Sequence, residues 1–277
     1  MKIIKDYITK NDRYKQNMHM KVKGLMIHDV GCTQPKASAF ISQWNKPNVT
    51  VAVHAIIEKG GIVHQCLPWN IQGWHSGAGS KSVSANNMYI GVEMTIPNSI
   101  VYTGPCTFKI TDKADAKAHV LDTYNTAVEL FAKLCEENNL DPLGKNDLGY
   151  PIILNHVEGH ELGIASNHGD TASIWSKFGL TMTKFRKDIA SKMKEPKKAI
   201  VNNKDYNCAA KVVCSDTLNV RDKRADSEGN LGNIVDTLEN GTEVTLGYVY
   251  NSWGSIYYIK EGKINHGFVN VKYLKLV

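Results

Sequence analysis

The chain changes character near residue 195, and this change constrains its fold more than any other feature of the sequence. Before it, apolar runs of strand length alternate with stretches in which apolar residues recur every three or four positions. After it, short β runs follow one another between Gly, Asn and Asp. The chain has 277 residues, enough for two domains. We therefore expect two domains, 1–194 and 208–277, joined by a polar linker over 195–207.

The pattern of the first domain predicts an α/β or α+β fold with a central mixed sheet flanked by helices. Its strand-length apolar runs lie at 22–28, 49–58, 89–96 and 151–156. A Gly60-Gly61 turn after the second run predicts a hairpin. Amphipathic helices are expected after Thr111 and over 179–194. The short β runs of the second domain predict a small all-β barrel.

Histidines and carboxylates gather between Asn155 and Trp175, in NHVEGHELGIASNHGDTASIW. Imidazole and carboxylate are the side chains that hold Zn²⁺ in hydrolytic sites. In addition, two apolar runs each end on a histidine, His28 and His156, and a strand end holds a ligand rigidly. One metal ion between adjacent strands is the favoured interpretation. The alternative is a polar surface loop whose histidines face water.

Five segments, in one order over about residues 20–192, make the first domain resemble zinc-dependent N-acetylmuramoyl-L-alanine amidases related to peptidoglycan-recognition proteins. They are GLMIHDVG, VAVHAIIEKGGIVHQ, GWHSGAG, NNMYIGVEM and NHVEG…NHGD. The resemblance implies a Zn²⁺ ion held by His28, His156 and Asp170. It further implies Glu93 as the general base and His168 as the group that stabilises the oxyanion. The substrate contacts that we expect from it are His54, Trp74, His75, Gly77 and Asn86.

Three of these assignments have alternatives. His160 has a spacing to Asp170 that also suits a metal ligand, although His156 follows its strand directly. His54 is either a substrate contact or a histidine satisfied within the core. Glu93 lies in an otherwise apolar run, where an unpaired carboxylate is costly to bury, so we expect it to face the cavity rather than form a salt bridge at an edge.

The second domain resembles bacterial SH3-like cell-wall domains. The matching pieces are LNVRDKRADSEGNLGNIVDTLENGTEV, the Trp253-Gly254 pair and HGFVNVKYL. The resemblance implies that this domain holds a lytic enzyme on a cell-wall polymer. Four aromatic residues are candidates for that contact, and we expect at least half of them to fill the barrel core instead: Trp253, Tyr257, Tyr258 and Phe268.

The two resemblances together predict a phage or prophage endolysin. Such an enzyme hydrolyses the amide bond between N-acetylmuramic acid and L-alanine in peptidoglycan and lyses the host. The alternatives are a host autolysin, a non-catalytic peptidoglycan-binding protein, and a cysteine peptidase with Cys32 or Cys66 as nucleophile. The presence of His28, His156 and Asp170 together argues against a protein that only binds peptidoglycan. Neither cysteine has a motif that would supply a low-pKa thiolate.

Composition bears on nucleic-acid binding, membrane insertion and cellular location. The net charge of +6 suits an anionic surface, yet no basic run interleaved with aromatics predicts nucleic-acid binding. No stretch approaches the ~18 apolar residues of a membrane span, so we expect no membrane insertion. The start, MKIIKDYITKNDRYKQ, lacks the apolar segment of a signal peptide. We therefore expect the protein in the host cytoplasm until a holin releases it to the wall. The six scattered cysteines predict free thiols.

Overall fold

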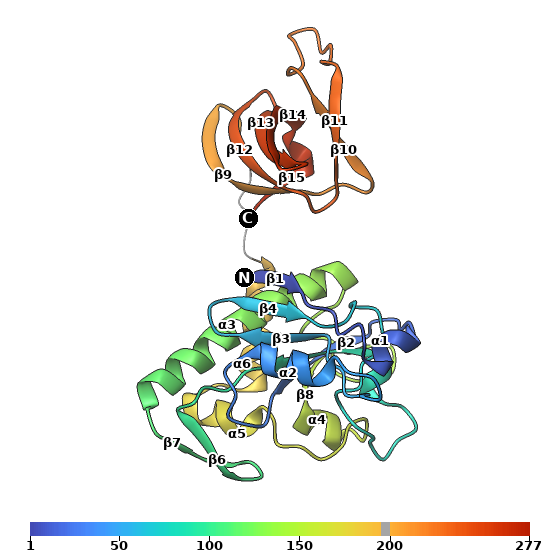
Figure 1. Cartoon of the computed structure of the whole chain (residues 1–277), viewed down its shortest axis with the longest axis vertical. Helices are drawn as coiled ribbons and strands as arrows, with labels where there is room; N and C mark the ends of the chain where they lie inside the picture. Colours follow the sequence, from blue (N-terminus) through green and yellow to red (C-terminus); the bar gives the residue numbers. More distant parts are fainter. Residues whose placement is uncertain (195–199) are drawn as a thin grey trace. The chain divides into compact units, whose positions relative to one another are not determined.

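The computed structural model describes residues 1–194 and 200–277 and divides the chain into two compact units, Met1–Lys194 and Glu195–Val277 (Figure 1). The expected linker therefore lies partly outside the described residues. Its second part differs from the expectation, because strand β9 begins at Lys204 and runs to Val212. The polar side chains of 204–207 do not prevent this, since the backbone pairs with a neighbouring strand while most of those side chains face water.

A six-stranded mixed sheet forms the centre of the first unit, as expected. Its order is β1 (Lys2–Lys5), β4 (Ile62–Gln65), β3 (Ala55–Glu58), β5 (Tyr89–Met94), β2 (Gly24–Asp29) and β8 (Ile153–Asn155). Only β3 and β4 pair antiparallel, across the hairpin whose turn holds Gly60 and Gly61 at φ +98° and +71°. Such positive φ angles suit residues without a Cβ.

Helices cover the sheet. They are α1 (Asp12–Gln16), α2 (Ala37–Trp44), α3 (Lys113–Asn138), α4 (His156–Glu161), α5 (Ala172–Trp175) and α6 (Met182–Lys194). Two 3-10 turns, Ala85–Asn87 and Ser176–Phe178, and a separate hairpin of β6 (Ile100–Gly104) with β7 (Thr107–Ile110) complete the unit.

Strand alternation decides which side chains enter which layer. Helix α3 starts at the N-cap Asp112, whose carboxylate accepts hydrogen bonds from the backbone of residues 114 and 115. Its apolar stripe and α6 form the main core with one face of the sheet, represented by Ile27 on β2 and Val92 on β5. The residues after these two, His28 and Glu93, therefore point to the opposite face of the sheet.

The second unit is a curled antiparallel sheet, the expected all-β SH3-like class. The strand order is β11 (Ile234–Glu239), β10 (Thr217–Arg221), β14 (Lys263–Asn270), β13 (Trp253–Lys260), β12 (Glu243–Tyr250), β9 and β15 (Leu274–Leu276), and a 3-10 turn spans Val271–Tyr273. It has its own core. Trp253 and Tyr258 are buried while Tyr257 is exposed, so half of the aromatic candidates fill the interior, as expected.

None of the helices in the described parts of the chain has both the length and the apolar character that crossing a membrane requires. All six cysteines are free thiols, as their spacing predicts.

Candidate functional site

The carboxyl ends of parallel strands place the histidines and acids of the site together. On neighbouring strands β2 and β5, His28 lies directly opposite Glu93. Strand β8 pairs with β2 on its other side and delivers His156 as the first residue of α4. A capping box fixes that position: the Asn155 side chain accepts from the backbone N–H of Glu158, and the Glu158 carboxylate accepts from the backbone N–H of Asn155.

Three side chains converge within this group. His28 Nδ1 lies 3.0 Å from Asp170 Oδ2 and 3.2 Å from His156 Nδ1. His156 Nδ1 lies 3.5 Å from Asp170 Oδ1, and one potential ligand atom from each residue falls within 4.8 Å of the others. The two histidines are almost fully buried, at 1% and 2% exposure. His160 is exposed and its Nδ1 lies near the carbonyl of Ala165, so it takes no part in the cluster.

A chain of hydrogen bonds determines which nitrogen of His28 carries the proton. His75 Nε2 lies 3.1 Å from the carbonyl oxygen of Tyr89, which only accepts, so the proton of His75 sits on Nε2. His75 Nδ1 is then an acceptor for His28 Nε2–H at 3.0 Å. Burial lowers the pKa of both rings and keeps them neutral. The Nδ1 of His28 therefore presents a lone pair to Asp170.

The same reasoning applies to His156. The hydroxyl of Ser166 donates to the carbonyl of Ser76 at 3.1 Å, so its oxygen accepts from His156 Nε2–H at 3.3 Å. Two imidazole lone pairs thus face each other across 3.2 Å beside a carboxylate. This arrangement is repulsive on its own and is relieved by a cation. Two imidazole nitrogens with one carboxylate also match the ligand set of catalytic zinc, so the residues present fit that ion.

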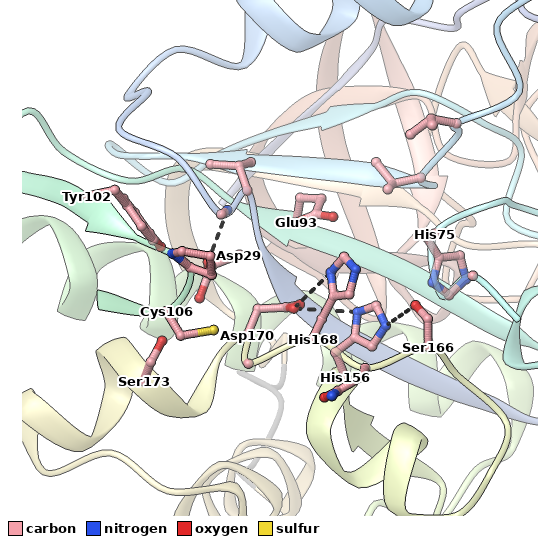
Figure 2. A pocket seen from close by; sticks show the side chains of 18 of the residues that line it. Asp29, His75, Glu93, Tyr102, Cys106, His156, Ser166, His168, Asp170 and Ser173 are labelled. Carbon is pink, nitrogen blue, oxygen red and sulfur yellow. Dashed lines mark hydrogen bonds and ion pairs between the residues drawn. The ribbon is translucent and has the colours of Figure 1, made fainter. Parts of the chain in front are cut away.

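Two further carboxyl groups lie beside the cluster (Figure 2). Burial, reinforced by the charges of Asp170 and Asp29, raises the pKa of Glu93 well above its ordinary value. Burial and the charge of Asp170 raise the pKa of Asp29 to about 7. One oxygen of each, Glu93 Oε2 and Asp29 Oδ2, is buried without a hydrogen-bond partner among the described residues. Glu93 faces the cavity as expected, with a raised proton affinity suited to a base.

A pocket of about 820 Å³ opens over these groups. One wall is apolar and is formed by Trp44, Val51, Val53 and Trp74. The guanidinium of Arg13 stacks at 4.5 Å on the ring of Trp74. The chemically active side of the lining holds Asp29, His75, Glu93, Tyr102, Cys106, His156, Ser166, His168, Asp170 and Ser173 (Figure 2). The volume is large enough for a sugar with part of a peptide.

His168 stands at the rim of this pocket. Its side chain is 63% exposed, its Nδ1 lies 3.8 Å from Asp170 Oδ1, and its ring stacks on that of His156 with centroids 4.5 Å apart. A ring in this position can donate a hydrogen bond to a group bound in the pocket.

Two of the expected substrate contacts, His54 and Asn86, have buried structural positions instead. His54 is fully buried, donates to the carbonyl of Ile71 at 2.7 Å and accepts from the backbone N–H of Gly91 at 3.0 Å, a position that matches the core alternative. Asn86 is also buried; its side-chain oxygen accepts from the backbone of His75 and Ser76 and so shapes the turn.

Gly77 and His75 line the pocket and also support the candidate metal ligands: Gly77 through Ser166 and His156, and His75 through its contact with His28. A Cβ at Gly77 would lie 2.4 Å from Ser166 Oγ, so the missing side chain lets Ser166 reach His156. Of the expected contacts, Trp74 alone combines a pocket position with an exposed side chain, at 38% exposure.

Sequence reasoning missed Asp29, Tyr102, Cys106 and Ser166. Asp29 had a signal, since it directly follows a strand-terminal ligand. Ser166 lies between His156 and Asp170 in the histidine-rich stretch, but serine is not a metal ligand there and gave no signal of its own. Tyr102 and Cys106 come from the β6–β7 hairpin, which shares no motif with the ligands. The cysteine alternative finds no support: burial raises the pKa of Cys66 to about 12, and burial with the charge of Glu93 raises the pKa of Cys32.

Comparisons with known proteins bear on the family and on the fold. Residues 18–173 match the family described as N-acetylmuramoyl-L-alanine amidase. The crystal structure of the Staphylococcus aureus hydrolase AmiA in complex with its ligand is similar with a TM-score of 0.52 and 19% identity, over 70% of this chain and 83% of that one. A mutant endolysin from Bacillus subtilis gives a TM-score of 0.45 and 20% identity, over 68% and 99%. The first of these likenesses supports the fold. No curated protein sequence matches the chain.

Proposed function

The chain belongs to the N-acetylmuramoyl-L-alanine amidase family, and on that premise we propose that it hydrolyses the amide bond between the lactyl group of N-acetylmuramic acid and L-alanine in peptidoglycan. One observation carries the proposal: two imidazole lone pairs and a carboxylate converge 3.0 to 3.5 Å apart beside the unpaired Glu93, under an open pocket. A protein that only binds peptidoglycan has no need of this arrangement.

We propose that His28, His156 and Asp170 hold Zn²⁺. When bound, the ion would polarise the scissile carbonyl and acidify the attacking water. Glu93 accepts a proton from that water and then delivers it to the departing alanine nitrogen. His168 donates a hydrogen bond to the oxygen on which negative charge develops. The products are a lactyl carboxylate on the glycan and a free amino terminus on the stem peptide.

We further propose that the protein acts as a phage or prophage endolysin, with the second unit holding it on the wall. The separate core of that unit and its exposed aromatic side chains support an independent binding module. In this view the enzyme accumulates in the host cytoplasm and reaches the wall after a holin opens the membrane. A host autolysin with the same chemistry remains the alternative.

Mass spectrometry of digested walls tests the reaction. Amidase cleavage releases intact stem peptides that begin with a free L-alanine amino group. A metal chelator should abolish their release and added Zn²⁺ should restore it, while a thiol-alkylating reagent applied to the dilute protein serves as the control for a cysteine peptidase. New amino termini at any other residue, or release of reducing sugar ends alone, would replace the amidase assignment.

A further inference from the structure

The second unit holds one arginine against an array of aromatic rings. The guanidinium carbon of Arg224, in the loop after β10, lies 5.0 Å from the ring centroid of Phe268, 5.7 Å from that of Tyr248 and 6.0 Å from that of Tyr250. Each distance is within the range of a cation–π interaction. The rings therefore fix the position of a positive charge on the surface of this unit.

This charge has no acidic partner in the described part of the chain. Arg224 Nε is buried and lacks a hydrogen-bond partner there, and no ion pair to the guanidinium is present among these residues. The neighbouring arginine differs: Arg221 donates from Nη1 to the carbonyl of Gly232 and so ties the loop to the strand. Arg224 thus has donor capacity that the fold does not use.

The aromatic array continues along the outward face of β14 and β13, which are neighbours in Figure 1. His266 lies edge-on to Phe268 at 5.1 Å, and Tyr257 lies 4.9 Å from His266, directly opposite it in the strand register. Tyr250 and Tyr257 are each 47% exposed. Their neighbours Val249, Ile256 and Val269 point into the core, so these rings are not needed to fill it.

We propose that Arg224 and the rings of Tyr248, Tyr250, Tyr257 and Phe268 form a binding site for a carboxylate-bearing segment of peptidoglycan. This inference rests on the proposed function. A guanidinium held near aromatic rings, with no ion pair to any described residue, keeps donors available for a bidentate contact with a carboxylate. The exposed tyrosine rings offer apolar area, at low entropic cost, to the sugar or peptide that carries the carboxylate.

Charge favours peptidoglycan over a polyanionic wall polymer. Over residues 200–277, nine Lys and Arg balance nine Asp and Glu, so this part of the chain has no net charge to attract a chain of phosphates. One unpartnered cation among rings instead suits isolated carboxylates on a mostly neutral chain.

The test is cosedimentation of the full-length protein, in a Glu93→Gln background that prevents digestion, with walls freed of phosphate polymers by hydrofluoric acid. Arg224→Gln should weaken binding about tenfold or more, because a charge-assisted bidentate contact is lost. Lys223→Gln removes the same charge from the adjacent exposed position and should bind as the parent does. Tyr257→Ala, which removes an exposed ring, should also weaken binding.

Methyl esterification of the wall carboxylates should bring the parent protein down to the affinity of Arg224→Gln and leave that variant unchanged. Equal binding by Arg224→Gln and its parent would overturn the site, as would a loss confined to walls that retain their phosphate polymers. If Arg224→Gln does not fold, the site is tested by two measurements: binding of Tyr257→Ala to untreated walls and binding of the parent protein to esterified walls. Hydrolysis of soluble muropeptides by Arg224→Gln with Glu93 intact should be unchanged; no hydrolysis even by the natural sequence would instead refute the proposed function.

Discussion

His28 Nε2 lies 3.0 Å from His75 Nδ1, and this contact places the proton of His28 on Nε2, so that Nδ1 presents a lone pair to Asp170. Because His75 donates its only proton to the carbonyl of Tyr89, it can only accept from His28. His75 therefore acts on the ligand cluster by positioning a proton, although the sequence places it in a motif that we associated with substrate.

Replacing His75 by Ala should lower the affinity for Zn²⁺ about 10- to 100-fold, because the tautomer and ring orientation of His28 are no longer fixed. His75→Gln should recover part of the affinity, since its amide oxygen can accept from His28 Nε2–H. Competition with a chromophoric chelator measures the affinity. His19→Ala removes an exposed histidine and is the control. Unchanged zinc affinity in His75→Ala would show that the contact is incidental.

Metal content should separate the ligands from their neighbours in the loop. His156→Ala and Asp170→Ala should each lose zinc and thermal stability, because binding of the ion is coupled to folding. His160→Ala, lying outside the cluster, should keep near-stoichiometric zinc. His168→Ala should keep zinc and lose rate. Zinc content by elemental analysis and specific activity are measured on each variant. Zinc lost from His160→Ala but kept by His156→Ala would reverse the ligand assignment.

Glu93→Gln should keep the fold and the metal while lowering turnover about 10²- to 10⁴-fold, because it removes the proton acceptor and little volume. Activity on soluble muropeptides, with zinc content measured on the same samples, checks this. A variant that retained more than a third of the parent turnover would move the role of base to another residue.

Stability of the metal-free protein should fall as pH rises from about 4 to about 7, in part because of Asp29. Its pKa is raised to about 7 in the folded state, mainly by burial. Between its unfolded pKa and that value the folded state binds more protons than the unfolded state, so rising pH favours unfolding. Asp29→Asn should flatten this decline. Urea unfolding at several pH values, with chelator present, measures it; an equal slope in both proteins would contradict the assignment.

A chain that ends at Lys197 should fold and bind zinc, since Met1–Lys194 forms a compact unit with its own core. Lysis of whole cells should fall more than hydrolysis of soluble muropeptides, because a tether raises local concentration only on an insoluble wall. Paired assays on the two substrates measure this. An equal loss in both would mean that the second unit contributes to the active site.

Local patterns were sufficient for the fold class. The apolar runs that end on His28 and His156 and the three- and four-residue spacing after Thr111 each reflect a periodicity within one element. The proposed ligands His28, His156 and Asp170 were suggested by the same runs and by the family resemblance, and the structure brings the three side chains together. The strand beginning at Lys204 was missed, because a half-exposed strand can carry polar side chains as long as its backbone pairs with a partner.

The sequence by itself thus determined the two fold classes and the residues able to hold a metal, because these depend on periodicity and on side-chain chemistry. Only the tertiary structure decided their roles. His54 and His75 look equivalent in the sequence, yet one is satisfied by the backbone of Ile71 and Gly91 and the other sets the proton of His28. The difference lies in hydrogen-bond partners from segments distant in the chain, and no local pattern encodes which of these partners will meet.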